Sequence, residues 1–522
     1  MEVDEGARLF TDHIDVDAED DLEYDESEEV HMKNKDPAER LEIEAEIEDL
    51  NRKVSQLRND YKLVDRLGTG TFSSVYKAVD LRHHKWDNTT WRGHHPPESS
   101  AHYQSAPHPR NSTFYVAIKR IYVTSSPERI RNEIAIMKDC LGCRHVSQLI
   151  TAFRHKDQVV AIMPYQRNED FRDFYTLLPM DGIKAYLRCM FRGLRDIHAR
   201  GIIHRDVKPA NFLYDPLSGV GTLCDFGLAS RIETVTGSSA NCCFHTSATA
   251  RHPHGEMKTT KTSRSEMAKK TQKEARARTK GPSHLVGYPS NDTRPTAKAN
   301  RAGTRGFRAP EVLLKCPDQN GAVDVWSVGV IMLFFLTRKF PLFQSSDDTE
   351  ALMEIATILG QKKMEEAATL HGKLFCTNAP SVPIQGMSWP EFCERLNPSL
   401  EEPLTPNPAW YPHAEIPPSK EEHLRDLRDA LDLLEHILEP KSVLRYTPKQ
   451  ALYHRFLRED IGDDEFRPHL FKGKGVCAAF HDEDDHGNCA VFHPSTDQLR
   501  LTKAGQGIAI GNEPCEIHQG LV

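Results

Sequence analysis

One string of eight residues, His204-Arg-Asp-Val-Lys-Pro-Ala-Asn211, constrains this chain more than any other part of it. It places a carboxylate (Asp206), a cation (Lys208) and an amide oxygen (Asn211) at short fixed offsets. Nineteen residues beyond Asp206, a second carboxylate opens the tripeptide Asp225-Phe-Gly227. Such a tripeptide alone would often occur by chance, but its occurrence downstream of this string is significant.

These groups are the ones that phosphoryl transfer requires. Its loose transition state needs a carboxylate to orient the incoming hydroxyl, a cation near the γ-phosphate and oxygen ligands for Mg²⁺. Asp206 and Lys208 suit the first two roles, and Asn211 and Asp225 suit the third. The sequence therefore predicts an enzyme that uses ATP and Mg²⁺.

A glycine-rich segment, Leu67-Gly-Thr-Gly-Thr-Phe-Ser-Ser-Val75, lies upstream between two predicted strands. Gly68 and Gly70 would let backbone amides approach phosphate oxygens without obstruction by a Cβ atom. Ser73 stands where a third glycine is usual, so an ordinary hairpin explains this segment equally well when it is taken alone.

The strand Val116-Ala-Ile-Lys119 ends in an ammonium group that needs a nearby carboxylate. Glu133, in the predicted helix Glu128 to Met137, is the candidate, because such an ion pair can hold a lysine on the α- and β-phosphates. Other carboxylates remain possible partners. This helical segment is short and poorly capped, so we expect Glu133 not to be held against Lys119 in the isolated chain.

Further motifs follow in a fixed order: Gly303-Thr-Arg-Gly-Phe-Arg-Ala-Pro-Glu311, Asp324-Val-Trp-Ser-Val-Gly329 and Arg445. Over about residues 61–457 the chain thus resembles the eukaryotic protein kinase superfamily. The resemblance implies an α+β, bilobal fold with a small antiparallel-sheet N-lobe and a larger helical C-lobe. It implies a structural ion pair between Glu311 and Arg445, and a nucleotide site formed by Gly68, Gly70, Val75, Ala117, Lys119, Met163 and Tyr165.

The residues in and around these motifs narrow the resemblance to one kinase family, DDK, the cell-division-cycle Ser/Thr kinases that trigger the firing of DNA replication origins. It rests on segments 70–76, 163–165, 206–214, 301–311 and 346–348, and on the separation of 86 positions from Asp225 to Glu311. It implies an activating regulatory subunit, and helicase subunits as substrates at serines followed by an acidic or phosphorylated residue. Arg301 and Arg308, which flank Thr304, could bind that acidic group, or they could tie the activation segment down.

Three other functions compete with this one. Another acid-directed or cell-cycle Ser/Thr kinase would differ in not needing a partner subunit. A pseudokinase scaffold is disfavoured, because Lys119, Asp206, Asn211 and Asp225 are all present. A DNA-bound structural protein that uses the basic insert would show salt-dependent duplex binding without the kinase lobes.

Charge and periodicity divide the rest of the chain. Residues 1–50 hold 21 acidic against four basic side chains, which predicts an acidic, disordered tail over 1–36. An amphipathic helix is expected over 37–60, the kinase domain over 61–457, and an extension over 458–522. Loop-like inserts are expected at about 82–111, 232–300 and 364–420. No apolar stretch suits a membrane span or a signal peptide.

Two secondary features concern localisation and metal binding. The basic run Lys269 to Lys280 resembles a nuclear import signal, which predicts a nuclear protein, although a solvated linker is also possible. It lacks interleaved aromatic residues, so direct nucleic-acid binding is not expected. Cys477, His481, His486 and Cys489 have spacings that could hold Zn²⁺, or they could lie in a small hairpin. Cys242, Cys243 and His245 form a weaker candidate.

Overall fold

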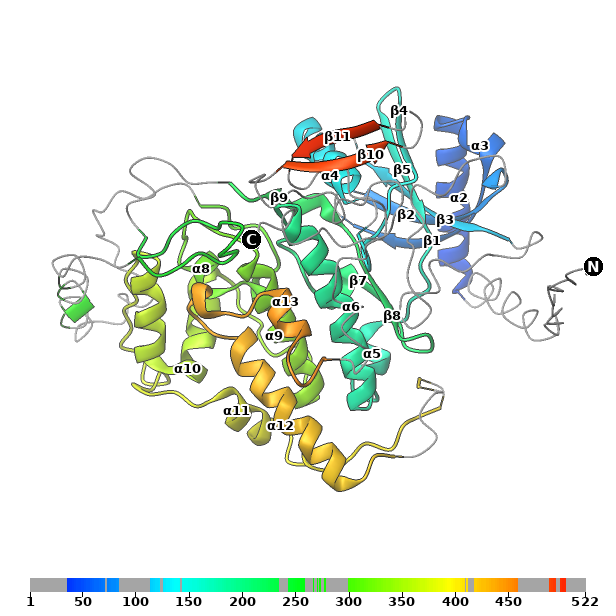
Figure 1. The fold of residues 1–522 in the computed structure, drawn as a ribbon. Helices are drawn as coiled ribbons and strands as arrows, with labels where there is room; N and C mark the ends of the chain where they lie inside the picture. Colours follow the sequence, from blue (N-terminus) through cyan, green and yellow to red (C-terminus); the bar gives the residue numbers. More distant parts are fainter. Residues whose placement is uncertain are drawn as a thin grey trace, which may run out of the picture.

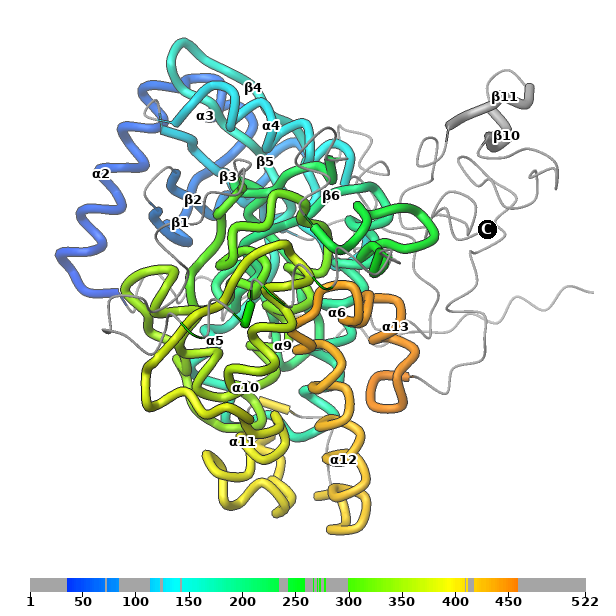
Figure 2. Tube along the Cα trace, turned by 90° about the vertical axis from the view of Figure 1, so that its left-hand side faces the viewer, coloured from blue at the N-terminus to red at the C-terminus, as the bar shows by residue number. Residues whose placement is uncertain are grey.

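A computed structural model describes the two lobes and their immediate connections. The residues described are 35–70, 73–83, 113–122, 125–140, 143–233, 243–258, 299–408, 410–411 and 417–458, with isolated positions between 266 and 277 and two terminal strands. Nearly all of the predicted acidic tail, the core of the first insert and most of the basic run lie outside these residues. The sheet and helices α2–α4 occupy the upper part of Figures 1 and 2, and the larger helical lobe lies below them.

The N-lobe contains a five-stranded antiparallel sheet in the order β1-β2-β3-β5-β4. The strands are β1 (Tyr61–Thr69), β2 (Ser73–Asp80), β3 (Tyr115–Ile121), β4 (Thr151–His155) and β5 (Gln158–Pro164). In the sequence, alternating side chains broken by glycines predict strands at 61–67, 74–79 and 115–121, and the first three strands of the sheet agree with them. The pairing brings the glycine-rich β1–β2 connection beside β3, the strand that carries Lys119.

Two cores use opposite faces of this sheet. Val116 and Ile118 of β3 belong, with β5 residues Val160 and Ile162, to a cluster that also contains α2 side chains. The alternate β5 residues Ala161 and Met163 belong to the main core, against which Ala117 also packs. Because successive strand residues point to opposite faces, the sheet separates helix α2 from the side that faces the C-lobe.

Helix α2 (Pro37–Lys53) forms the expected packing contact with the kinase domain (Figure 1). Asp36 caps its first turn by accepting a hydrogen bond from the amide of Ala38. Leu50, together with Val54 and Leu57 beyond the helix end, is buried in the sheet's outer cluster. The helix ends earlier than predicted, and the short α3 (Leu57–Asp60) leads directly into β1.

The C-lobe is mainly helical and encloses the larger core. Its helices are α5 (Phe171–Phe174), α6 (Met180–Ala199), α8 (Pro310–Leu313), α9 (Ala322–Thr337), α10 (Asp348–Leu370), α11 (Trp389–Leu396), α12 (Lys420–Ile437) and α13 (Pro448–Leu452). Helix α9 is buried on every side, which agrees with the apolar run from Val328 to Leu336 that forms its second half. In the sequence, apolar residues recur at helical spacing over 182–200, 320–338 and 421–438, and helices α6, α9 and α12 occupy these segments.

Short elements connect these helices and carry the catalytic motifs. They are β6 (Ile202–Ile203), η3 (Pro209–Asn211), β7 (Phe212–Asp215), β8 (Val220–Leu223), η4 (Phe226–Leu228), β9 (Ser230–Arg231), η7 (Arg305–Phe307) and η8 (Ser442–Leu444). Helix α4 (Pro127–Asp139) belongs to the N-lobe. Beyond the kinase domain, the backbone of β10 (Asn488–His493) pairs with β11 (Gln498–Lys503).

The prediction of loop-like structure over 364–420 is wrong for two stretches of that range. Helix α10 continues to Leu370, and α11 covers residues 389–396. The Ser, Pro and charged residues that lie between these helices favoured a loop over the whole range, although Ser388 before Trp389 is an ordinary N-cap, accepting from the amide of Glu391. In the second insert, residues 243–258 pack against the C-lobe.

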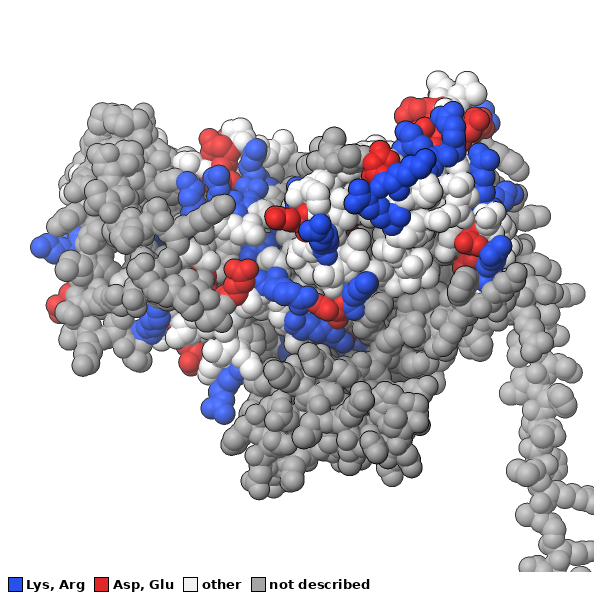
Figure 3. Space-filling model, turned by 90° about the horizontal axis from the view of Figure 1, so that it is seen from above, with Lys and Arg blue, Asp and Glu red and all other residues white. Residues whose placement is uncertain are grey.

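The described surface carries mixed charge. Seen from above, Lys and Arg side chains lie among Asp and Glu side chains (Figure 3). On α2 this arrangement includes Glu42 and Glu46, which both contact Arg66 of β1. Among the described residues, no helix combines the length and apolar character that crossing a membrane requires.

Candidate active site

The lysine at the end of β3 is paired with the carboxylate that the sequence proposed. Lys119 Nζ lies 2.6 Å from Glu133 Oε1 on α4 and 3.0 Å from Asp225 Oδ1. Burial alone would lower the pKa of Lys119, but the two carboxylates outweigh it and raise that pKa above its usual value. The amine is therefore charged at neutral pH.

The expectation that Glu133 would not be held against Lys119 in the isolated chain is wrong for this structure. Helix α4 is 13 residues long and Ser126 provides no side-chain cap, as expected from the sequence. However, Asn132 Nδ2 donates to the carbonyl of Ala229, 3.0 Å away, and so ties the helix to the segment after Asp225. This tertiary contact stabilises the position of helix α4, although the helix has no side-chain cap.

The proposed nucleotide residues lie on one face of the sheet. Val75 is directly opposite Lys119 across β2 and β3, and Ala117 is opposite Met163 across β3 and β5. Directly paired residues of adjacent strands share a face. Their small or apolar side chains thus surround the lysine, and Tyr165 follows where the chain leaves β5.

The glycines of the β1–β2 segment keep space open above this face. A Cβ atom placed on Gly68 would meet nothing within 4 Å, and one on Gly70 would meet only the carbonyl oxygen of Ser73 at 3.6 Å. Neither glycine is therefore needed for packing within the described chain. Open backbone beside a paired lysine fits a polyphosphate, whose oxygens require close approach to amide groups.

The catalytic loop gathers three of the predicted residues around Asp206. Lys208 Nζ lies 2.8 Å from Asp206 Oδ2, and Asn211 Nδ2 donates to the same oxygen at 3.0 Å. Thr304 donates to Oδ1 from its amide at 2.9 Å and from its hydroxyl at 2.7 Å. Burial favours a higher pKa for Asp206, but the bonds from Lys208 and Thr304 prevail and lower it. Asp206 is therefore an ionised acceptor.

Asp324 of α9 holds the backbone of this loop, a role that the sequence motif alone did not assign. Its carboxylate is fully buried and accepts from the amides of His204 and Arg205, each at 2.8 Å. Arg205 has a left-handed backbone conformation, with φ of 70°, which costs about 1–2 kcal/mol in a non-glycine residue. The carboxylate stabilises the conformation that presents Asp206.

The DFG segment places its carboxylate next to the lysine and the catalytic loop. Phe226 is fully buried and packs edge-on against His204, with ring centroids 5.0 Å apart. The amide of Cys224 donates to the carbonyl of Asn211 at 2.9 Å, so the two predicted metal ligands belong to adjoining segments. The side chain of Asp225 remains half exposed.

This arrangement fits Mg²⁺-bound ATP. Carboxylate and amide oxygens are the ligands that Mg²⁺ prefers, and Asn211 and Asp225 would hold it. ATP supplies the transferable phosphoryl group when bound. Asp206 can orient a substrate hydroxyl by accepting its proton, and Lys208 can offset charge that develops near it. Lys119 can orient phosphate oxygens from the opposite side.

The predicted substrate arginines both contact one acidic residue of α10. Arg308 Nη1 lies 2.5 Å from Asp348 Oδ1, and Arg301 Nη1 lies 3.2 Å from Asp348 Oδ2. Arg308 also donates twice to the carbonyl of Gly303. The structure thus brings both arginines together beside Thr304. Sequence reasoning did not identify Asp348 as their partner, although it begins a helix where an acidic residue is favourable.

The expected structural ion pair is present and deeply buried. Arg445 Nη1 and Nη2 lie 2.7 and 3.1 Å from the two oxygens of Glu311. Arg445 also donates to the carbonyl of Ala322 at the start of α9. The pair therefore anchors the end of the activation segment to the helix that supports the catalytic loop.

The proposed zinc cluster of the C-terminal extension lies largely outside the described residues. Cys477, His481 and His486 are not described, and for Cys489 only the backbone of β10 is. A different cysteine–histidine group lies within the C-lobe, at Cys243, His245 and Cys316. The sequence suggested its first two members but missed Cys316, which follows them by more than 70 positions.

The fold and the site together define a protein kinase. A family model described as "Protein kinase domain" matches residues 106–248 and 287–457. The "Cell cycle serine/threonine-protein kinase hsk1" of Schizosaccharomyces pombe is 39% identical over 80% of this chain and 76% of its own length. The "Cell cycle protein kinase spo4" of the same yeast is 36% identical over 79% and 88%.

A human relative is named after a cell-division-cycle kinase. The "Cell division cycle 7-related protein kinase" of Homo sapiens is 29% identical over 68% of this chain and 74% of its own length. This chain belongs to the cell division cycle 7 family of serine/threonine protein kinases. The resemblance to DDK is thereby confirmed.

Proposed function

We propose that this cell-cycle kinase initiates DNA replication by phosphorylating subunits of the replicative helicase at serines followed by an acidic or phosphorylated residue. The observation that carries the proposal is a basic hollow of about 500 Å³ next to Thr304. Arg301, Arg305, Arg308 and Lys315 line it together with two acidic residues, Asp347 and Asp348. Basic groups are in excess, which favours an anionic ligand.

Asp348 illustrates the chemistry that this hollow suits. Its carboxylate engages both Arg301 and Arg308, and guanidinium groups bind carboxylates and phosphates through several donors. In a bound substrate peptide, the hydroxyl of the acceptor serine would reach Asp206. The acidic side chain of the next residue would then compete with Asp348 for the guanidinium donors. The alternative function of the two arginines is to tie α10 to the activation segment.

Peptide kinetics separate these two functions. Phosphate transfer would be measured on three serine peptides with Asp, phosphoserine or Ala after the acceptor, using wild type, Arg301→Ala, Arg395→Ala as a surface control, and Asp206→Ala as an inactive control. We expect Arg301→Ala to raise KM for the two acidic peptides roughly tenfold or more, the effect of losing a hydrogen bond to a charged group. An equal loss of activity on all three peptides would instead support the alternative, in which the arginines hold α10 against the activation segment.

An activating subunit forms part of the same proposal. The pair of Lys119 and Glu133 is already closed, so such a subunit would stabilise helix α4 rather than create its contact. The assay should therefore compare the chain alone with the chain carrying its co-purifying subunit. Full activity of the chain alone would refute the need for an activating subunit and would favour another acid-directed Ser/Thr kinase.

Nuclear localisation is proposed from the basic run Lys269 to Lys280 alone. Replacing its lysines and arginines with alanine in the full chain should move a fluorescent fusion out of the nucleus. Retention in the nucleus would refute import by this segment.

A further inference from the structure

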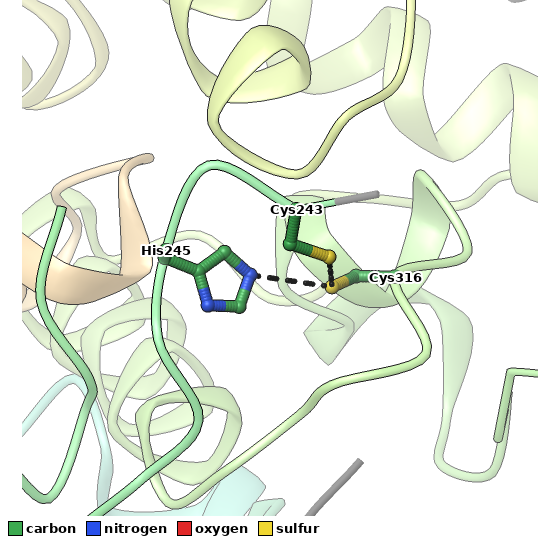
Figure 4. A group of neighbouring side chains, drawn as sticks. All are labelled: Cys243, His245 and Cys316. Atoms are coloured by element: carbon green, nitrogen blue, oxygen red, sulfur yellow. Dashed lines mark hydrogen bonds between the residues drawn. The ribbon is translucent and has the colours of Figure 1, made fainter. Parts of the chain in front are cut away.

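A group of sulfur and nitrogen atoms converges inside the C-lobe, away from the catalytic residues (Figure 4). Cys243 Sγ lies 3.6 Å from Cys316 Sγ, which lies 3.5 Å from His245 Nε2. His371 Nδ1 approaches that same nitrogen to 3.1 Å. All four residues are buried, none more than 4% exposed, and no step of phosphoryl transfer uses them.

We propose that Cys243, His245, Cys316 and His371 form a structural Zn²⁺ site that fastens the second insert to the C-lobe. The spacing supports a tetrahedral ion: bonds of about 2.3 Å to sulfur and 2.0–2.1 Å to nitrogen place neighbouring ligand atoms roughly 3.8 Å (S to S), 3.6 Å (S to N) and 3.4 Å (N to N) apart. Ligand atoms of Cys243, His245 and Cys316 all lie within 4.8 Å of one another, and the three separations given above are each within a few tenths of an ångström of these values. His371 Nδ1 adjoins His245 Nε2 and would move toward the two sulfur atoms to complete the tetrahedron.

Hydrogen bonding orients one ligand in the manner typical of zinc sites. His245 Nδ1 lies 2.9 Å from the carbonyl oxygen of Thr246. A carbonyl only accepts, so Nδ1 carries the hydrogen and Nε2 presents a lone pair to the cluster. Metal-bound histidines usually donate their second ring nitrogen to a carbonyl or carboxylate in this way.

A disulfide is the main alternative for the two cysteines. Its sulfur atoms would be about 2.05 Å apart, whereas here they are separated by 3.6 Å and both cysteines are free. Without a metal, the thiols of Cys316 and Cys243 could donate to the carbonyls of Asp318 and His371, which would leave sulfur lone pairs and His245 Nε2 directed at one another. A metal provides a common partner for all the lone pairs directed into it.

The ligands come from three separate parts of the chain. Cys243 and His245 open the described segment 243–258, Cys316 follows α8, and His371 directly follows α10. The amide of Phe244 already donates to the carbonyl of Leu370 at 2.8 Å. An ion at the centre would therefore fix the insert against the end of α10.

The site also adjoins the support of the catalytic loop. Gln319 donates to the carbonyl of Cys316 at 2.8 Å and accepts from Arg205 Nη1 at 2.6 Å. Ser247 of the insert donates to Asp318 at 2.6 Å. Fixing Cys316 would thus fix the residues that hold the side chain of Arg205.

The test measures bound metal rather than activity. The full chain carrying Cys477→Ser and Cys489→Ser, which removes the thiols of the other candidate cluster, would be purified and its zinc determined by mass spectrometry. We expect about one zinc per chain, as for a closed structural site. Adding Cys243→Ser or Cys316→Ser should abolish it, whereas adding Cys393→Ser, a buried cysteine of α11, should not.

Cobalt spectroscopy keeps the test valid if a loss variant fails to fold. The parent chain loaded with Co²⁺ alone should show thiolate charge-transfer absorption and tetrahedral visible bands. His371→Cys should retain the metal and increase the charge-transfer absorption, because a third thiolate replaces a nitrogen ligand. Absence of zinc from the parent, zinc unaffected by both cysteine variants, unchanged cobalt absorption in His371→Cys, or a disulfide between Cys243 and Cys316 would each overturn the assignment.

Discussion

Replacing Asp324 with asparagine tests whether one buried carboxylate controls the geometry of the catalytic loop. In the native protein Oδ2 accepts from the amide of His204 and is 2.8 Å from His198 Nε2, while Oδ1 accepts from the amide of Arg205. The side-chain oxygen of the introduced asparagine could keep the first two bonds. Its NH₂ group would then face the N–H of Arg205, so two donors would oppose each other.

The size of the effect follows from that loss. A hydrogen bond to a charged group contributes about 1.5–3 kcal/mol, and the left-handed conformation of Arg205 costs about 1–2 kcal/mol that the carboxylate now offsets. The loop in Asp324→Asn is thus disfavoured by about 2.5–5 kcal/mol relative to a relaxed peptide. We expect kcat to fall at least roughly tenfold, since about 1.4 kcal/mol is a factor of ten.

The assay separates positioning from nucleotide binding. Steady-state kcat and KM for ATP would be compared for wild type, Asp324→Asn and Asp426→Asn, whose carboxylate pairs with Lys184 on the C-lobe surface. Because Asp324 does not contact the lysine or the glycine-rich segment, KM for ATP should change less than twofold, a difference of about 0.4 kcal/mol. An unchanged kcat in Asp324→Asn would refute the reasoning.

Acid stability provides an independent check of the same residue. Burial would raise the pKa of Asp324, but the hydrogen bond and charge of His198 prevail and lower it below its usual value. A carboxylate whose pKa is lowered by folding stabilises the protein above its unfolded pKa of about 3.9, and that stability is lost as pH falls through the folded pKa. Urea midpoints should therefore decline less steeply below pH of about 4 in Asp324→Asn than in wild type.

Three further substitutions have outcomes that the structure predicts. Glu311→Gln leaves the buried guanidinium of Arg445 without its carboxylate and should lower the free energy of unfolding of the C-lobe, measured in urea, by about 3–5 kcal/mol. If adding Arg445→Met recovers none of that free energy, the broken ion pair is not the cause of the loss. Leu50→Ala opens the outer N-lobe cluster and should cost about 2–5 kcal/mol in the same measurement, against a negligible change for the exposed Leu41→Ala. Glu133→Gln removes the charge beside Lys119 and should raise KM for ATP and lower kcat together; a variant with wild-type kinetics would exclude this pair from nucleotide binding.

The catalytic motifs and the three sheet strands near them were predictable because their chemistry depends on local spacing. Asp206, Lys208 and Asn211 lie within six residues, so the sequence itself sets their proximity. Glu133 could be proposed for Lys119 because few carboxylates sit on a helical segment between β3 and the catalytic string. Helices α10 and α11 were missed, since the sequence between them is rich in Ser, Pro and charged residues and resembles a loop until the packing of both helices in the C-lobe is known.

The unforeseen contacts are those between segments distant in sequence. Asp348 meets Arg308 across 40 residues, and Cys243 meets His371 across 128. Neither separation has a periodicity that a strand or a helix would impose. Such pairs are set by how whole helices pack, which local propensity does not encode.

The alternation along β3 means that helix α2 also sets the frame of the nucleotide site. Ile118 faces the helix while Lys119, the next residue, is directed to Glu133. A slip of one residue against β5 would exchange their environments, presenting a hydrocarbon to the phosphates and an ammonium group to Leu50. Contact with the N-terminal helix thus penalises strand pairings that are shifted by an odd number of residues. Removal of the helix should therefore reduce correct assembly of the sheet as well as the stability of the folded enzyme.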